Sequence, residues 1–449
     1  MRRPTQKMRS DFMKIKVIDT TYGELLKEKQ ALHERHGGHI KPKRPNLFFR
    51  TLMRVVAAPD LIATKFKFEK AGMEKLDKRE SAIFLMNHSS FIDLEIVARM
   101  LYPRPFNIVT TTDGFIGKNW LMRQIGCFPT KKFVQDPTLI KDMHHVIDNL
   151  HSSVVLFPEA GYSFDGTSTV LPESLGRCVK HFGVPVIMIT TYGAFSRDPL
   201  YNNLQRRKVE VRATEEYLLS PEEIEQMSEE EINGVLKKAF SFDSFRWQQR
   251  EHVKIDEDFR ADYLNRVLYK CPVCKKEGEM EGKGTALTCK ACGKKYNLDE
   301  YGYLVAEDGN THFPHVPDWY NWQREEVRRE LEDGRYMIDI PVEIFATIDT
   351  KRLFRIGEGR LSHTKDGFVL EGCEGELHYK QRPLASYTLN SDYNWYEIGD
   401  MLSIGNSDVQ YYCFPKTKGD IVTKARLATE ELYKIVRRAV LERRAGATS

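Results

Sequence analysis

Residues 87–93 read Asn-His-Ser-Ser-Phe-Ile-Asp and directly follow an apolar run, Ile83–Met86, that is typical of a buried strand. The stretch places the imidazole of His88 five residues before the carboxylate of Asp93. On a helix, at about 100° per residue, an offset of five separates two side chains by about 140°. The pair can therefore meet only if His88 lies in the turn before a helix. We expect Asp93 in the first helical turn, binding one imidazole nitrogen and leaving the other free as a base.

The same residues also have a simpler interpretation. Ser89 or Ser90 is the expected N-cap of the helix, and Ser90-x-x-Asp93 alone is a loose capping box beside an ordinary loop histidine. A second block favours a site. The apolar run 154–157 ends in Pro-Glu-Ala-Gly, so that the carboxylate of Glu159 stands at a strand end and small residues follow it. Open α/β sheets build their sites at such strand ends.

Taken together, the His-x4-Asp block and the Phe-Pro-Glu block resemble the glycerolipid acyltransferase family, whose best-known members acylate 1-acylglycerol-3-phosphate. Residues 126–132 lie where the family has its second block and Val184–Ile187 where it has its fourth, so the resemblance covers roughly residues 45–220. It implies that the first block supplies the catalytic pair and that the Phe-Pro-Glu block helps to bind the acceptor. The implied site residues are His88 and Asp93 for catalysis, and Glu159, Gly161, Lys131 and Lys132 for acceptor binding.

Acceptor binding is where this chain departs from the family pattern. Tyr162 stands where the family usually has an arginine that is expected to contact phosphate, and Lys131 or Lys132 replaces the usual arginine of the second block. A lysine keeps the positive charge but lacks the planar fork of a guanidinium. On the residues alone, Glu159 could instead pair with a nearby lysine, and the two lysines could form a solvated turn.

The chemistry expected of these residues is general-base acyl transfer. His88, held by Asp93, takes the proton from an acceptor hydroxyl, which attacks the thioester carbonyl of acyl-CoA or acyl-carrier protein. Backbone N–H groups at the helix start after Ser89 are candidate donors to the oxyanion. Glu159 is expected to bind acceptor hydroxyls, and a lysine to bind a head-group phosphate if one is present.

A length of 449 residues predicts about two to four domains.

Charge is small overall and uneven along the chain. The formal net charge is only +4, but residues 1–54 contain fourteen Lys or Arg and five Asp or Glu. Such an arm suits nucleic acid or an anionic lipid surface.

The segment at 47–56 favours lipid. It places two neighbouring apolar stripes on a helix, Phe48, Leu52 and Val55 beside Phe49, Met53 and Val56, with Arg50 and Arg54 on another flank. This pattern is typical of a helix in a membrane interface, and equally of a core helix that covers a sheet. The sequence has no run of about 18 apolar residues and no signal-peptide pattern. We therefore expect a peripheral protein on the cytoplasmic face of a membrane, without a spanning helix.

Strand and helix patterns alternate between and after these blocks. Strands are expected at 106–111, 154–157, 184–191 and 209–213, and helices at 118–125, 137–150 and 173–182. This alternation predicts an α/β domain with a mainly parallel sheet. Ser220 and Pro221 then open an acidic helix, as its cap and first-turn residue, near the end of that domain.

Four cysteines have the spacing of a zinc ribbon. Cys271-x2-Cys274 is separated by fourteen residues from Cys289-x2-Cys292, and Gly293 suits the positive φ of a knuckle. Four thiolates predict a structural zinc ion with a closed tetrahedral shell. Disulfides are the alternative, and a reducing cytoplasm disfavours them. Zinc ribbons also occur in nucleic-acid-binding proteins, but the short basic runs beside these cysteines are weak support for that function.

The C-terminal part of the chain is expected to be β-rich. Asp318 should cap a charged helix that ends near Leu331, with aromatic residues that pack domains together. From Pro341 onward strands alternate, with a hairpin signal in the Lys-Asp-Gly sequence at 365–367, and a basic helix follows over 420–444. This layout resembles a pleckstrin-homology-like barrel closed by a C-terminal helix.

The predicted domains are a basic N-terminal arm (1–45), a glycerolipid acyltransferase-like domain (46–255), a zinc ribbon (262–308), a linker helix (309–340) and a β-rich domain (341–445). The predicted function is a peripheral membrane acyltransferase of phospholipid biosynthesis. It would move a fatty acyl group from a thioester to a hydroxyl of a lysophospholipid such as 1-acylglycerol-3-phosphate. The alternative is a non-catalytic lipid-binding or scaffold protein that retains the fold, and nucleic acid is not expected as a partner.

Overall fold

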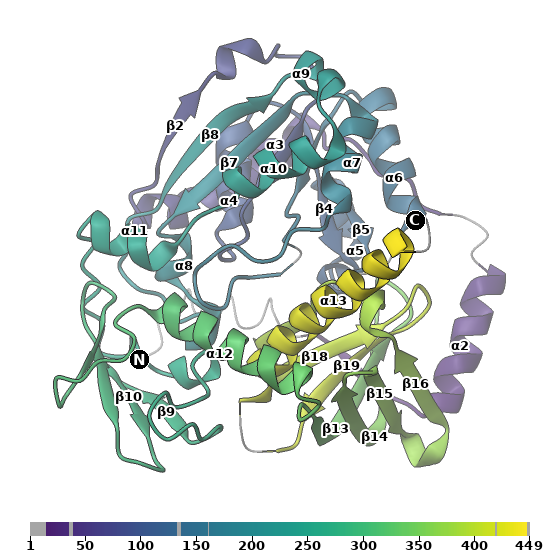
Figure 1. Cartoon of the computed structure of the whole chain (residues 1–449). Coiled ribbons are helices and arrows are strands. Elements are labelled where there is room, and N and C mark those ends of the chain that lie inside the picture. Colours follow the sequence, from purple (N-terminus) through teal and green to yellow (C-terminus); the bar gives the residue numbers. More distant parts are fainter. Residues whose placement is uncertain (1–14, 36–38, 133–135, 160, 418–419, 447–449) are drawn as a thin grey trace.

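The computed structural model describes residues 15–35, 39–132, 136–159, 161–417 and 420–446. A seven-stranded sheet with its helices lies above a four-stranded sheet and an eight-stranded sheet (Figure 1). Two helices, α12 (Val316–Glu332) and α13 (Ile421–Gly446), run between the upper and lower parts. Positions 1–14, which hold several basic residues of the predicted arm, lie outside the described residues.

The seven-stranded sheet carries the strands predicted for the α/β domain. Its order is β2-β8-β7-β3-β6-β4-β5, in which β7 and β8 run antiparallel and the other neighbours run parallel. The strands are β2 (Lys67–Ala71), β3 (Ile83–Met86), β4 (Phe106–Thr111), β5 (Cys127–Thr130), β6 (Ser153–Leu156), β7 (Val186–Tyr192) and β8 (Arg212–Leu219). The strands expected at 106–111, 154–157 and 184–191 are confirmed, with ends shifted by no more than two residues.

The strand expected at 209–213 forms only from Arg212 onward. The backbone of Val211 bonds instead to Thr64 and Lys67, between α3 (Leu47–Ala63) and β2, before pairing with β7 begins. The predicted strand start was wrong for a physical reason. Val209 and Val211 are apolar because they are buried in the core, and they do not take part in the strand pairing with β7.

Strand β3 owes its continuous apolar run to cover on both faces of the sheet. Phe84 and Met86 belong to one core cluster, and Ile83 and Leu85 belong to another. All four side chains are fully buried. Strands covered on both sides have near-continuous apolar sequences. The carboxyl end of β3 leads directly into the turn at 87–92, which therefore rests on a rigid base.

Helices pack against each face of this sheet. The cluster that holds Phe84 includes residues of α3 and α4 (Asp93–Leu101), and the cluster that holds Ile83 includes residues of α6, α7 and α10. The remaining bounds are α5 (Asn119–Gln124), α6 (Pro137–His144), α7 (Ser174–Phe182), α9 (Pro221–Gln226), α10 (Glu229–Ala239) and α11 (Ser244–Arg250). Ser220 caps α9 in a capping box, as predicted. The helix expected at 137–150 changes after His144 into a π-helical turn, His145–Asn149.

The four-stranded sheet holds the predicted ribbon and continues into α12. Its antiparallel order is β12-β11-β10-β9, from β9 (Met280–Lys283), β10 (Ala286–Cys289), β11 (Lys295–Leu298) and β12 (Leu304–Ala306). The prediction of Asp318 as the helix cap was wrong: α12 begins at Val316 with His315 at the N-cap, because Pro317 suits the first turn. Trp319 is fully buried, and its indole N–H donates to the carbonyl of Lys270 at 2.9 Å. The aromatic residues of α12 thus pack domains together, as predicted.

The C-terminal sheet has strand order β16-β15-β14-β13-β19-β18-β17, with α13 packed beside it. Its strands are β13 (Ile338–Thr347), β14 (Leu353–Thr364), β15 (Gly367–Gly372), β16 (Leu377–Gln381), β17 (Asn390–Trp395), β18 (Gly399–Gly405) and β19 (Gln410–Pro415). The hairpin predicted at 365–367 is confirmed, since β14 and β15 pair antiparallel around it. The C-terminal region is therefore β-rich and ends in a helix.

The described part of the N-terminal arm packs on this C-terminal sheet. Strand β1 (Val17–Asp19) pairs parallel with β14 and is the eighth strand of the C-terminal sheet. Helix α2 (Tyr22–Arg35) follows, with Leu25 buried and Lys29 bonded to Asp408 at 3.2 Å. Among the described residues, no helix is long and apolar enough to cross a membrane.

Candidate active site and metal centre

His88 and Asp93 meet at the carboxyl end of β3 as the sequence predicts. Nδ1 of His88 lies 3.0 Å from Oδ2 of Asp93. The same oxygen accepts the backbone N–H groups of Ser89, at 2.9 Å, and Ser90, at 3.1 Å. Asp93 is buried in the first turn of α4 and therefore holds both the ring and the turn that carries it.

The predicted serine cap was wrong. Helix α4 begins at Asp93, and its N-cap residue, Ile92, makes no capping bond through its side chain. The hydroxyl of Ser90 donates instead to the carboxylate of Asp198, which lies 108 residues further along the chain. The backbone N–H groups of Ser89 and Ser90 are already bonded to Asp93, so an oxyanion donor at this helix start would have to come after Ser90, and that role stays a prediction.

The hydrogen bond to Asp93 sets the chemistry of the imidazole. A carboxylate oxygen only accepts, so Nδ1 of His88 carries the proton and Nε2 carries the free lone pair. Within the described residues, Nε2 has no hydrogen-bond partner. The ring lies between two aromatic rings, with centroid distances of 4.5 Å to Phe157 and 4.0 Å to Tyr162. The His88 side chain is 21% exposed, which leaves an approach for a substrate.

Glu159 braces the turn from the end of β6. It is fully buried, and its Oε2 accepts the backbone N–H of His88 at 2.9 Å. Its Oε1 accepts the backbone N–H of Thr169 at 2.6 Å. Burial raises the pKa of this carboxyl to about 7. Glu159 thus ties the turn that carries His88 to Thr169, and its contact with acceptor hydroxyls stays a prediction.

This raised pKa predicts a pH-dependent stability. The folded protein holds the Glu159 proton more tightly than the unfolded chain does, whose pKa is about 4.5. The stabilisation is complete below that value and is lost as the pH rises through about 7. Glu159→Gln removes this titration, so its free energy of unfolding should decline less between about pH 5 and about pH 8 than that of the wild type. Denaturant unfolding at several pH values measures how steeply the free energy of unfolding changes with pH in the wild type and in Glu159→Gln. Equal pH dependence in the two proteins would contradict the prediction.

The predicted acceptor-binding residues separate into two places. Nζ of Lys132 donates to Oδ1 of Asn390 at 3.1 Å, on the side of the C-terminal sheet. Lys131 instead lines a cavity of about 210 Å³, whose lining also includes Asp136 and Asp408. At Gly161, an added Cβ would meet no atom of the described residues within 4 Å, so that position is open. The acceptor-binding roles stay predictions.

A buried ion-pair network behind the turn was not predicted. Arg197 lies 2.7 Å from Asp198 and 3.3 Å from Asp60 of α3, and Arg206 also bonds to Asp60. Both Arg197 and Asp198 are buried, and Asp198 accepts the Ser90 hydroxyl. The sequence holds no spacing signal for this network, because its members come from segments that only the fold brings together.

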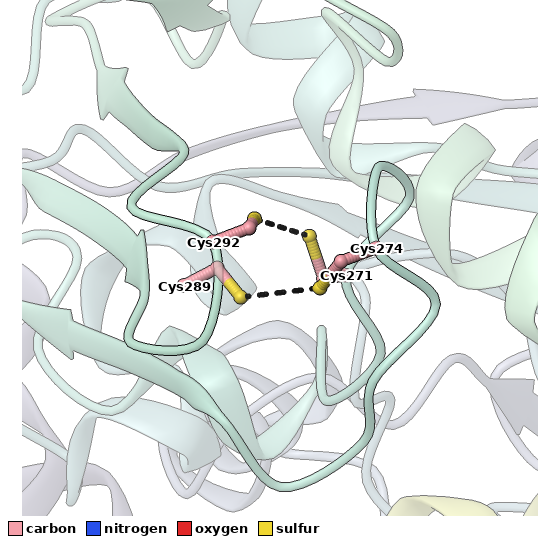
Figure 2. A group of neighbouring side chains, drawn as sticks. All are labelled: Cys271, Cys274, Cys289 and Cys292. Atoms are coloured by element: carbon pink, nitrogen blue, oxygen red, sulfur yellow. Dashed lines mark hydrogen bonds between the residues drawn. The ribbon is translucent and has the colours of Figure 1, made fainter.

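The four ribbon cysteines form a compact sulfur cluster (Figure 2). Their ligand atoms all lie within 4.8 Å of one another, and the Cys271–Cys292 and Cys274–Cys289 sulfur distances are both 3.7 Å. Sulfurs around a tetrahedral zinc ion, with bonds of about 2.3 Å, lie about 3.8 Å apart. A disulfide joins sulfurs at about 2.05 Å. The cluster is therefore not disulfide-bonded, and its geometry suits a single metal ion.

The backbone around the cluster has the predicted knuckle conformation. Gly293 has a φ of +76°, as the knuckle pattern predicts. Burial raises the pKa of the Cys271 thiol to about 12 and also raises the pKa of the Cys289 thiol, and backbone hydrogen bonds from the later residues of each Cys-x2-Cys pair oppose both rises. All four positions are filled by cysteine, so a bound ion would have a closed protein shell.

Comparison with known proteins bears on the first of these sites. Residues 67–191 match the family model described as Acyltransferase. Among solved structures, the chain is similar to the 1-acyl-sn-glycerophosphate acyltransferase PlsC of Thermotoga maritima, at 15% sequence identity and a TM-score of 0.31, over 42% of this chain and 78% of that chain. The segment matched by the family model runs from β2 into β7 and includes His88, Asp93 and Glu159.

Proposed function

Since residues 67–191 belong to the acyltransferase family, we propose that this protein transfers a fatty acyl group from acyl-CoA or acyl-carrier protein to a hydroxyl of a lysophospholipid such as 1-acylglycerol-3-phosphate. The observation that carries the proposal is the contact between His88 and Asp93 at the end of β3. It leaves one imidazole nitrogen basic and partly exposed, as a general base requires.

The transfer follows from this geometry. Nε2 of His88 accepts the proton of the acceptor hydroxyl as its oxygen attacks the thioester carbonyl carbon. The carbon–sulfur bond then breaks, and the leaving thiolate takes the proton back from the imidazolium. Asp93 holds Nδ1 throughout, fixing the ring and stabilising its positive charge while the intermediate exists. The residues thus act as a general base and its positioning carboxylate, without a protein nucleophile.

The test is a mass-spectrometric assay of the full-length protein with a panel of lysolipids and both thioester donors. Acylated lipid should form with at least one acceptor and should be absent with His88→Ala. Transfer by neither protein would favour a binding or scaffold role, and equal transfer by both would exclude His88 as the base.

We further propose that α3 holds the protein on the cytoplasmic face of a membrane. Its inner side packs in the core through Ala57 and Leu61. Its outer side leaves a stripe exposed, with Phe48 at 67%, Val55 at 62% and Ile62 at 75%. Helices that lie in a lipid interface bury such a face among the acyl chains.

Removing two side chains of this stripe should weaken vesicle binding. Phe48→Ser with Val55→Ser removes apolar groups that would each contribute about 1.5–3 kcal/mol when buried in lipid. Binding to phospholipid vesicles, measured by co-sedimentation, should fall at least about tenfold. Leu441→Ser is a matched control, because Leu441 is 51% exposed on α13 instead. Unchanged binding of the double variant would contradict the role of α3.

The other two regions suggest more specific assignments. We propose that the sulfur cluster holds a zinc ion, which four thiolates suit in closed structural sites. The β-rich region is proposed to have a pleckstrin-homology-like fold. The order of the strands supports that assignment. The antiparallel strands β13 to β16 come first in the chain, β17 to β19 follow, the two groups pair through β13 and β19, and α13 comes last.

A further inference from the structure

Strand β17 of the C-terminal sheet contacts the acyltransferase segment at two places. Next to β5, the ammonium of Lys132 donates to Oδ1 of Asn390, which is buried. Next to the 158–169 loop, the ring of Tyr393 lies 4.5 Å from that of Phe164. The strand therefore spans from the lysine predicted to bind the acceptor to the loop that begins at Glu159.

Helix α13 strengthens the second of these contacts. The guanidinium of Arg426 donates to the backbone carbonyl of Tyr162 at 3.1 Å and lies 4.3 Å from the centre of the Phe164 ring. Tyr162 in turn stacks on His88. The C-terminal region thus holds the backbone of Tyr162, whose ring lies beside the base.

Asp392 is the acidic group that β17 presents there. Asn390 and Asp392 are two residues apart on a strand, so their side chains share one face, about 7 Å apart along it. The bond between Lys132 and Asn390 shows that this face looks toward the end of β5. Among the described residues, Oδ1 of Asp392 is buried and has no hydrogen-bond partner.

The electrostatics agree with this placement. Burial raises the pKa of Asp392 to about 7, the charge of Lys132 opposes that rise, and Asp113 and Asp400 add to it. Burial raises the pKa of Tyr162, whose ring lies 4.0 Å from that of His88, and the charges of Asp93 and Asp392 add to the rise.

An ammonium and a carboxylate with one buried oxygen discriminate between head groups. A phosphomonoester carries close to two negative charges near pH 7, which Asp392 in its ionised form would repel. A phosphodiester carries one, which Lys132 can balance. If its head group also carries a hydroxyl or an ammonium, that group gives the unpaired oxygen of Asp392 the donor that a buried carboxylate requires.

Building on the acyl transfer proposed above, we propose that Lys132, Asn390 and Asp392 form a head-group subsite. This subsite binds one class of lysolipid in preference to another. The preferred class is the phosphodiesters whose head group donates hydrogen bonds, and the disfavoured class is the phosphomonoesters. The catalytic pair then comes from the acyltransferase segment, whereas acceptor selectivity comes from β17. Tyr162, at the position of the family's arginine, fits this arrangement because it adds no second cation for a dianionic phosphate.

The test compares kcat/KM of the full-length protein for 1-acylglycerol-3-phosphate with the values for its phosphoglycerol and phosphoethanolamine diesters, using one thioester donor. The wild type should prefer a diester, and the two diesters distinguish a hydroxyl donor from an ammonium donor. Asp392→Asn should shift the diester-to-monoester ratio at least about tenfold toward the monoester. Glu397→Gln removes one exposed negative charge from the same hairpin and should leave the ratio unchanged. An unchanged ratio in Asp392→Asn, or a wild type that prefers the monoester, would overturn the subsite.

Two further measurements separate the failure of the subsite from other failures. Lys132→Gln should raise KM for the diesters without lowering kcat to the same extent, which tests the subsite even if Asp392→Asn does not fold. If no lysolipid is acylated, the proposed acyl transfer fails. Equilibrium binding of the same three lipids to wild type and Asp392→Asn then decides the subsite, and identical ratios of Kd values would overturn it.

Discussion

His88→Ala should lower kcat for acyl transfer by about 10²–10⁴-fold while the protein stays folded. The variant loses the lone pair on Nε2 that is proposed to take the acceptor proton. Asp93 keeps its bonds to the backbone of Ser89 and Ser90, so the turn at 87–92 should persist. Initial rates at saturating donor and acceptor measure the loss, and circular dichroism with thermal unfolding reports the fold.

A matched histidine variant separates the loss of a base from a general effect. His378→Ala removes a histidine that is 53% exposed on β16 and bonded only to a surface glutamate, and its kcat should match that of the wild type. The kcat of Asp93→Asn should lie between those of His88→Ala and His378→Ala. The ring of His88 keeps an acceptor for Nδ1 in this variant but loses the charge that stabilises the imidazolium. A fully active His88→Ala variant would refute general-base catalysis by this residue.

Cys271→Ser together with Cys289→Ser should release the metal ion and strongly destabilise the chain. In isolated zinc-finger peptides a structural zinc ion contributes about 10–16 kcal/mol of binding free energy that appears as folding free energy. The ribbon shares one apolar cluster with α12 and the C-terminal sheet, so the loss should spread beyond residues 262–308. We expect the unfolding midpoint to fall by on the order of 10 °C or more.

Metal content and thermal unfolding of the purified protein check this second expectation. The wild type should carry close to one equivalent of zinc by elemental analysis, and the double variant almost none. Cys178→Ser is the control, because Cys178 lies on α7, away from the cluster, and should change neither quantity. A native protein that contains no metal would refute the zinc assignment, whatever the stability of the variant.

Local patterns made much of the site predictable from the sequence. His88 and Asp93 are five residues apart, and the rigid end of β3 leaves few ways to arrange the turn between them. The four cysteines form two close pairs, whose knuckles need only local backbone geometry. In both cases the groups that make the chemistry are near neighbours in sequence, so periodicity and spacing carry the information.

The parts that could not be predicted depend on long-range contacts. Ser90 donates its hydroxyl to Asp198, which is 108 residues away, and the N-cap position of α4 is Ile92 instead. Lys132 faces Asn390, and the two are 258 residues apart. Nothing in the pattern of residues 390–395 distinguishes a strand that borders an active site from an ordinary strand of a β-rich domain. Tertiary packing decides such contacts, and a single sequence does not contain that information.

The pairing of β1 with β14 has a consequence for synthesis of the chain. Asp19 and Arg355, which bond across this pair, are 336 residues apart. At roughly 5–20 residues per second, the partner of β1 leaves the ribosome roughly 20–70 s after β1 itself. Asn390 and Arg426, which contact the acyltransferase segment, emerge later still. A nascent chain can therefore complete its seven-stranded sheet long before the C-terminal segments that contact it have been synthesised.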